Sequence, residues 1–123
     1  MKAIVIDDSK AIRTIIKKIL LSSGFEVVEA AHGREALDRL GETGAVDLAL
    51  VDWNMPEMNG LEFVTAVRAD HSMDGMRVMM VTTETEMSQV TAALEAGANE
   101  YVMKPFTPEV LREKIGILGL GSP

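Results

Sequence analysis

The chain has 123 residues, of which 47% are apolar and 25% are charged, a composition typical of one globular domain with a buried core. Its 19 acidic residues outnumber its 12 basic ones and give a formal net charge of −7, so no nucleic-acid partner bound through phosphates is expected. The absence of cysteine excludes disulfides, thiolate metal sites and cysteine nucleophiles.

The first half of the chain alternates short apolar runs with segments of helical period. Residues 3–6 form a β-branched run that predicts a strand, and residues 25–30 alternate only in part, as in a strand near a sheet edge. The helix between them is predicted from the spacing of Ile12, Ile15, Ile16, Ile19 and Leu20. A second helical segment opens at Gly33 and is closed by Gly41 or Gly44.

The second half repeats this alternation. Residues 47–51 read DLALV, a nearly continuous apolar run that predicts a strand covered on both faces. A third helical segment leads to a fourth strand at residues 76–81, and residues 96–103 close a fourth helix and enter a fifth strand.

Two later helices carry recognisable start signals. Thr83 and Glu86 have the spacing of a capping box, although Thr85 is an alternative cap. Thr107 suits the N-cap of the last helix, and Pro108 suits its first position, where the missing N–H costs little.

Strands that alternate with helices predict an α/β fold, in which a parallel sheet has helices on both faces. No linker, internal repeat or low-complexity segment divides the chain. We therefore expect one domain over residues 1–119 and a flexible tail over residues 120–123.

Polar side chains follow four of the five predicted strands. Asp7 and Asp8 follow the first, Asp52 the third, Thr82 the fourth and Lys104 the fifth. Because ligands of such sheets bind outside the carboxyl ends of the strands, these five groups are expected at one edge.

The chemistry of these groups suggests a phosphoryl-transfer site. Three converging carboxylates repel one another unless a cation joins them, and Mg²⁺ binds through a few carboxylates and waters. Lys104 adds a point charge suited to phosphate, and Thr82 adds a hydroxyl donor. Asp52, at the end of the central strand, is the candidate nucleophile.

Each of these residues also has a simpler interpretation. The Asp7-Asp8 pair can belong to the cap of the first helix, and Asp52 can be an Asx-type turn residue. Thr82 can be a helix-entry residue, and Lys104 a solvated lysine. Only the joint placement at strand ends argues against these readings.

Other conspicuous residues are interpreted as structural. The methionine-rich run at residues 76–80 and Trp53 are expected to pack in the interior. His32 and His71 lack a partner at a useful spacing and are expected on the solvated surface.

Four motifs, IDDSKAIR, LVDWNMPEMNG, MMVTTE and YVMKPF, resemble in order and spacing the receiver domain of two-component response regulators. The resemblance covers essentially the whole chain and is closest to the stand-alone chemotaxis type. It implies a flavodoxin-like (βα)5 fold, a doubly wound five-stranded parallel sheet of order 2-1-3-4-5.

The resemblance also implies a role for each strand-end residue. Asp52 would be the phosphoacceptor, and the donor would be a histidine kinase or a histidine phosphotransfer protein. Mg²⁺, for which Mn²⁺ would substitute, would be held by Asp8 directly, Asp7 through water, Asp52, and the Asn54 backbone carbonyl. The receiver itself would catalyse the transfer and its reversal, without being an enzyme for an external substrate.

Phosphorylation would then act as a switch. Thr82 would hydrogen-bond the phosphoryl oxygen and Lys104 would pair with it, and Tyr101 would turn inward as Thr82 moves. The helix 4-strand 5-helix 5 surface would change for a protein target. The Lys104-Pro105 peptide bond is expected to be cis.

Some residues are expected to tune the phosphoryl lifetime. Asn54 and Glu84 would flank the path of the attacking water and match the chemotaxis type. Thr83 departs from the small residue common at its position, so its bulk is expected to narrow access to the phosphoryl group. Trp53 is a less common choice beside the acceptor, and its indole is expected to lie close to the metal, although it can instead point into solvent.

Two other functions remain as alternatives. A pseudo-receiver would keep the fold as an interaction module without phosphorylation, but such proteins usually lack some of the residues found here. A Mg²⁺-dependent phosphohydrolase with an aspartyl phosphate would place two aspartates one residue apart after the first strand. Flavin binding is disfavoured, because Asp7 and Asp8 would repel an anionic cofactor.

The expected setting is the cytosol and the expected state a monomer with no membrane partner. The apolar stretch before Asp7 is too short for a signal peptide, and no apolar run approaches the ~20 residues that span a bilayer.

Overall fold

A computed structural model of the chain describes residues 1–120 apart from the Glu84 side chain; residues 121–123 of the expected tail lie outside the described residues. Five parallel strands form one sheet in the predicted order β2-β1-β3-β4-β5. The strands are β1 (Lys2–Ile6), β2 (Glu26–Ala30), β3 (Leu48–Asp52), β4 (Arg77–Thr82) and β5 (Glu100–Met103). The helices are α1 (Lys10–Ser22), α2 (Gly33–Thr43), α3 (Gly60–Ala69), α4 (Val90–Ala96) and α5 (Pro108–Ile117), with 3-10 helices at His71–Met73 and Glu84–Gln89.

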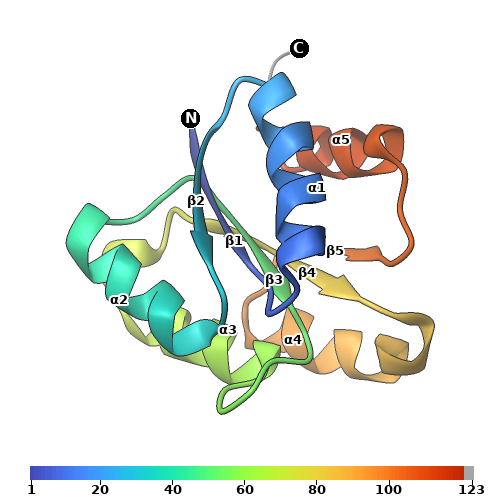
Figure 1. The fold of residues 1–123 in the computed structure, drawn as a ribbon. Coiled ribbons are helices and arrows are strands. Elements are labelled where there is room, and N and C mark those ends of the chain that lie inside the picture. The colour runs from blue at the N-terminus through green and yellow to red at the C-terminus, as the bar shows by residue number, and fades with distance from the viewer. Residues whose placement is uncertain (121–123) are drawn as a thin grey trace.

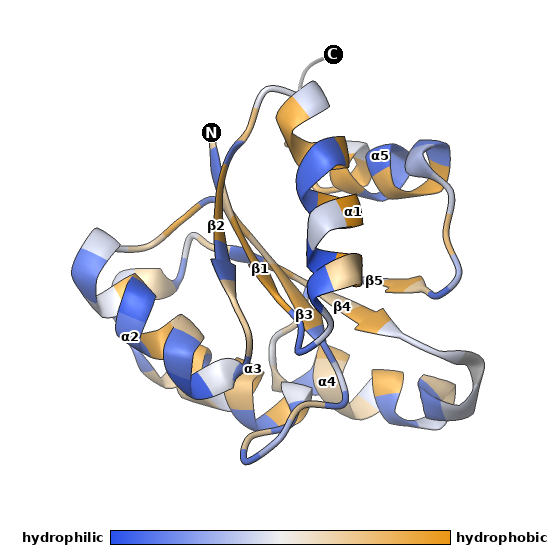
Figure 2. Ribbon diagram, in the orientation of Figure 1, coloured by the Kyte–Doolittle hydropathy of each residue, from blue (hydrophilic) through white to orange (hydrophobic). Residues whose placement is uncertain are grey.

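The sheet lies between two layers of helices. Figure 1 shows α1 and α5 on one face and α2, α3 and α4 on the other. Successive side chains of β3 point to opposite faces and all are buried, so each face has its own apolar cluster. In Figure 2 the strands are mainly hydrophobic and the helices carry both colours, as expected for amphipathic helices that cover a buried sheet.

The α1–α5 cluster, defined as the apolar side chains beneath these two helices, confirms most of the first predicted stripe. Ile16, Ile19 and Leu20 are buried in it, and Ile12 packs against it. Ile15 is 49% exposed, because it lies at the edge of the stripe and lines a surface groove instead. Helical spacing alone does not distinguish these two environments.

Helix ends follow the predicted signals, with one correction. Gly44, at a φ of 82°, closes α2, and Thr107 caps α5 ahead of Pro108. His32 is only partly buried, but it does not lack a partner as the sequence predicts. Its Nδ1 accepts a hydrogen bond of 3.2 Å from the backbone N–H of Glu35 and so caps α2.

The α4 segment begins with a tighter helix than predicted. The Glu86 carboxylate accepts from the Thr83 backbone N–H at 2.9 Å, as the predicted capping box requires. The Thr83 and Thr85 hydroxyls share a hydrogen bond of 2.9 Å. The chain then forms the 3-10 helix at Glu84–Gln89, and regular α-helix starts only at Val90.

Arg68, at the end of α3, joins three parts of the fold. Its guanidinium donates to the Asn99 side-chain oxygen and to three backbone carbonyls, those of Met73 and Met76 before β4 and that of Gly97 before β5. The backbone amide of Val78 also donates to Asn99. This network fixes the amino ends of β4 and β5, opposite the predicted site.

The end of the described chain is better packed than predicted. Leu118 and Leu120 are partly buried against the α1–α5 cluster, whereas the sequence predicts that the flexible tail starts at residue 120. Within the described residues, no helix combines the length and apolar character needed to cross a membrane.

Candidate functional site

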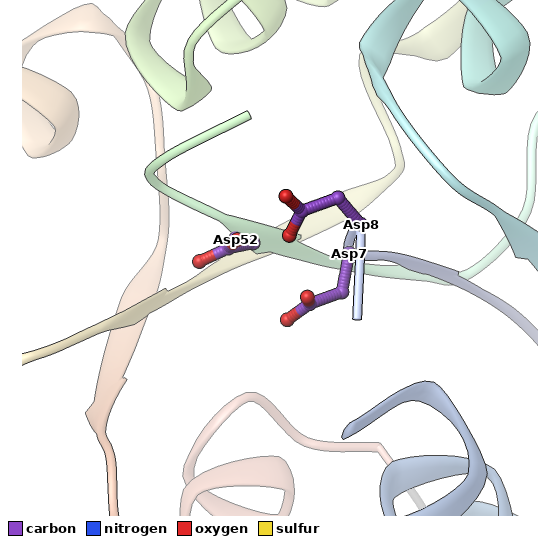
Figure 3. A group of neighbouring side chains, drawn as sticks. All are labelled: Asp7, Asp8 and Asp52. Carbon is purple, nitrogen blue, oxygen red and sulfur yellow. The ribbon is translucent and has the colours of Figure 1, made fainter. Parts of the chain in front are cut away.

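The carboxyl ends of β1 and β3 bring three carboxylates together. Asp7 and Asp8 directly follow β1, and Asp52 is the last residue of β3. One carboxylate oxygen from each lies within 4.8 Å of the others, and Figure 3 shows the three side chains grouped. Asp7 and Asp52 are buried and Asp8 is exposed, so the group opens to solvent on the Asp8 side.

Lys104 supplies one positive charge to this acidic group. Its Nζ lies 3.2 Å from Oδ1 of Asp52 and 3.4 Å from Oδ2 of Asp7. The Lys104 backbone N–H donates to the Thr82 carbonyl at 2.6 Å, so the ends of β4 and β5 stay joined. The Lys104-Pro105 peptide bond is cis, as expected.

The electrostatics of the site balance burial against charge. Burial of the Asp52 carboxylate, followed by the negative charge of Asp7, raises its pKa from 3.8 to about 6, although Lys104 acts in the opposite direction. Burial also disfavours the Lys104 ammonium, but the carboxylates of Asp52 and Asp7 outweigh that effect and raise its pKa. The site therefore holds more negative charge than one lysine neutralises, and a cation would stabilise it.

The donor set fits a magnesium ion. Carboxylate oxygens are the ligands that hard divalent cations take, and Mg²⁺ usually uses only one or two together with waters. The exposed Asp8 leaves room for such waters. Asn54 is exposed and lies two residues after Asp52. Coordination of the metal by its backbone carbonyl stays a prediction.

Capping of α1 accounts for only some of the contacts that Asp7 makes. The Ser9 hydroxyl accepts from the Ile12 backbone N–H at 3.3 Å and is the cap of α1. Asp7 Oδ1 accepts from the Ser9 backbone N–H at 2.8 Å, while its other oxygen faces Lys104. Asp7 therefore serves the helix start and the acidic group together.

Thr82 lies at the expected strand end, with its hydroxyl turned toward the following helix. The side chain is fully buried, and Oγ1 donates to the sulfur of Met87 at 3.7 Å. Asp52 pairs with Val81 in the sheet register, so Thr82 lies one residue beyond the carboxylate. A hydrogen bond from Thr82 to a phosphoryl group thus remains a prediction that requires movement.

Tyr101 and the tuning residues occupy varied surroundings. Tyr101 is partly buried against the α2–α4 cluster, defined as the apolar side chains beneath α2, α3 and α4, and the Lys114 ammonium lies 4.5 Å from its ring centroid. Thr83 lines a groove beside Lys104. The Glu84 side chain lies outside the described part of the chain, so its predicted role is not tested.

Trp53 is a core residue. Its side chain is 8% exposed and belongs to the α2–α4 cluster, so packing is confirmed and a solvent-facing indole is wrong. The methionines at positions 76, 79 and 80 are also buried, as predicted. His71 is exposed beside Asp74, as predicted for a surface histidine.

Sequence reasoning missed Arg13 and Glu29. Arg13 stands at the end of the IDDSKAIR motif, and its guanidinium reaches both Glu29 on β2 and the Asp7 carbonyl. The motif was a signal for this arginine, but nothing in the sequence paired it with Glu29. Phe106 was also missed; it lines the groove next to Lys104.

Comparison with known proteins identifies the family. The family model of the response regulator receiver domain matches residues 3–116. The chain belongs to the response regulator receiver family. The strand-end acids, the lysine and the threonine described above belong to the motifs that carry the resemblance, and here the acids and the lysine meet at one edge of the sheet.

Several receiver proteins resemble the whole chain. A chemotaxis protein CheY homolog of Campylobacter jejuni is 51% identical over 124 aligned residues, which cover 99% of this chain and 95% of that protein. The chemotaxis protein CheY1 of Helicobacter pylori is 47% identical, and 96% of each chain is covered. The solved structure of Vibrio cholerae chemotaxis protein CheY4 has a TM-score of 0.87 at 37% identity, with 94% of this chain and 96% of that chain covered. These receivers therefore share the fold along nearly the full length of this chain.

Proposed function

We propose that the chain is a single-domain response regulator in which Asp52 accepts a phosphoryl group in a Mg²⁺-dependent reaction. One observation carries the proposal. The buried Asp52 carboxylate ends the central strand beside Asp7 and Asp8, with the Lys104 ammonium at 3.2 Å. A pseudo-receiver without phosphorylation would have no need to keep this unfavourable grouping.

The chain's own residues would perform most of the transfer. Asp52 forms a bond to phosphorus, and the bond from phosphorus to the imidazole nitrogen of the donor breaks with its electron pair left on nitrogen. Lys104 holds Oδ1 of Asp52, and among the described residues Oδ2 has no hydrogen-bond partner and is available to attack. The rigid strand end orients the carboxylate, which lowers the entropic cost of the encounter.

Asp7, Asp8, Asp52 and the Asn54 carbonyl are the residues proposed to hold the ion. A bound Mg²⁺ would neutralise charge on the phosphoryl oxygens and on the carboxylates. Because no external enzyme group is required, small acyl phosphates are expected to serve as donors, and the receiver is expected to catalyse both gain and loss of the phosphoryl group.

An apolar groove beside the site is suited to a histidine-bearing donor. The groove has a volume of about 400 Å³ and is lined by Ile12, Ile15, Thr83, Lys104, Pro105 and Phe106. The half-exposed Ile15 would contact the donor there, which explains an apolar side chain at a solvated position. A histidine kinase or histidine phosphotransfer protein is the proposed partner.

A second surface is proposed for the downstream target. The face formed by α4, β5 and α5 exposes Leu94, Met103, Val110 and Ile117, each at least 40% accessible. Tyr101 on β5 and Lys114 on α5 belong to this face and are in contact. Movement of Thr82 toward a phosphoryl group would leave space behind β4 for Tyr101 to turn inward, and this face would change.

The named relatives favour chemotaxis as the pathway, since they are chemotaxis proteins at about half identity. We expect the protein to act in the cytosol as a monomer.

Heteronuclear NMR with and without beryllium fluoride, a stable phosphoryl mimic, tests the proposal. With Mg²⁺ present, we expect shifts at the site and a second group of shifts on α4, β5 and α5. The Asp52→Asn variant should show neither. Shifts confined to the site would refute the proposed switch surface, and no shifts in the wild type would favour the pseudo-receiver.

A further inference from the structure

Arg13 links three elements next to the acidic group. It is the fourth residue of α1, and its side chain is only 15% exposed. Its Nε lies 3.3 Å from Oε1 of Glu29 on β2, and its Nη1 donates to the Asp7 carbonyl at 2.5 Å. A guanidinium can make both contacts at once because its donors form a rigid planar fork.

The carbonyl that Arg13 contacts belongs to the peptide unit that joins Asp7 to Asp8. On its other side, Asp7 is fixed by its backbone N–H, which donates to the Ala30 carbonyl at 3.1 Å, and by its side chain, which faces Ser9 and Lys104. Within the described residues, the Asp8 carboxylate has no hydrogen-bond or ion-pair partner. Its position therefore depends mainly on the orientation of that peptide unit.

We propose that Arg13 is a positioning residue for the metal site: by holding the Asp7-Asp8 peptide, with Glu29 as its anchor on β2, it sets the Asp8 carboxylate for Mg²⁺. The inference rests on the proposed Mg²⁺-dependent function. Arg13 would touch neither the metal nor the phosphoryl group, since its contacts are with Glu29 and the Asp7 carbonyl. It acts through the backbone, as residues that orient metal ligands commonly do.

Lys17 provides a matched control. It lies one turn further along α1 and its Nζ lies 3.4 Å from the other Glu29 oxygen, but it does not reach Asp7. Removal of Lys17 takes one cation from the same glutamate and leaves the Asp7-Asp8 peptide held. A general loss of charge at this surface would affect both variants alike, whereas positioning predicts an effect of Arg13 alone.

The first experiment measures the Mg²⁺ dissociation constant of the unphosphorylated protein by titration calorimetry. Arg13→Ala is expected to weaken Mg²⁺ binding about tenfold, the lower end of the range for the loss of a residue that orients a metal ligand. Lys17→Ala is expected to change it less than about twofold. Arg13→Lys should recover only part of the affinity, because one ammonium cannot bridge both partners.

A second experiment uses chemical rescue. A pocket of about 330 Å³ adjoins Arg13, between α1, β2 and α2, and Glu29 and Glu35 are among its lining residues. In Arg13→Ala, guanidinium chloride at millimolar concentration should enter this space and restore Mg²⁺ affinity, while sodium chloride at equal ionic strength should not. Lys17→Ala should show no response to guanidinium.

A metal-free readout separates positioning from stability. In EDTA, the Ser9 amide should exchange its hydrogen faster in Arg13→Ala than in the wild type, while amides of the distant strand ends stay protected at a temperature well below unfolding. Three results would each overturn the inference. They are a wild-type Mg²⁺ affinity in folded Arg13→Ala, a full recovery of Mg²⁺ affinity in Arg13→Lys, and equal losses of Mg²⁺ affinity in Arg13→Ala and Lys17→Ala. If the wild type itself bound Mg²⁺ but took no phosphoryl group, the proposed function would fail while this inference stood.

Discussion

Removal of one acid from the site should relieve a charge conflict that costs stability. Asp7→Asn keeps an oxygen that can accept from the Ser9 N–H, so it removes charge with little change of shape. The pKa of Asp52 is raised from 3.8 to about 6, first by burial and next by Asp7. We expect the substitution to lower the Asp52 pKa from about 6, but not to its ordinary value, because burial remains.

The size of the effect follows from linkage. A rise of about two pKa units corresponds to roughly 3 kcal/mol at 1.36 kcal/mol per unit, and screening by nearby solvent reduces this to about 1–2 kcal/mol. Because the folded-state pKa is raised, the stabilisation from protonated Asp52 is complete below pH 3.8 and is lost as the pH rises through about 6. Asp7 causes part of the shift, so Asp7→Asn should gain about 1 kcal/mol at neutral pH in metal-free buffer.

Urea unfolding in EDTA between pH 4 and pH 8 measures this gain, and NMR titration of the Asp52 carboxyl measures the pKa. Asp38→Asn, at an exposed position on α2, is the control for a loss of one negative charge. It should leave the Asp52 pKa unchanged. If Asp7→Asn neither lowered that pKa nor raised stability above the control at neutral pH, the electrostatic account of the site would be wrong.

Three further substitutions test separate parts of the account. Thr83→Ala should raise the autodephosphorylation rate by less than about tenfold, equivalent to under 1.4 kcal/mol, because Thr83 lines the approach to Lys104; an unchanged decay constant would contradict this. Gly60→Ala should destabilise the fold by about 1–3 kcal/mol in urea unfolding, because the new methyl would lie 3.1 Å from Cα of Trp53 and would clash with Met80. Wild-type stability would show that the β3–α3 turn can shift without cost. Arg68→Ala should lower the free energy of unfolding by about 2–4 kcal/mol without altering Mg²⁺ affinity, because its carbonyl contacts lie at the opposite end of the sheet. A loss of Mg²⁺ affinity in this variant would contradict the claim that Arg68 acts independently of the site.

The strand ends were predictable because parallel strands place their carboxyl ends at one edge. Once residues 47–51 were assigned to a buried strand, Asp52 had to lie at that edge, and the same argument applied to Asp7 and Lys104. The strand order came from the family resemblance, since the apolar pattern alone does not say which strands are neighbours. Both expectations match the observed sheet.

Other features depend on contacts that no local pattern records. The Arg13–Glu29 pair joins residues far apart in sequence, and the capping role of His32 depends on the orientation of its ring. Ile15 has the spacing of a core residue but lines a groove, because its neighbours across the groove come from the β5–α5 segment. The sulfur contact between Met87 and Thr82 likewise requires the tight helix after β4.

The central claim is that Asp52 takes a phosphoryl group with the help of a divalent cation. Intact-mass spectrometry after incubation with acetyl phosphate and Mg²⁺ tests it most directly, with EDTA and the Asp52→Asn variant as controls. We predict one added phosphoryl group that requires the metal and is absent from the variant. An unmodified wild-type protein, with rapid phosphate release excluded by a parallel assay for free phosphate, would contradict the claim.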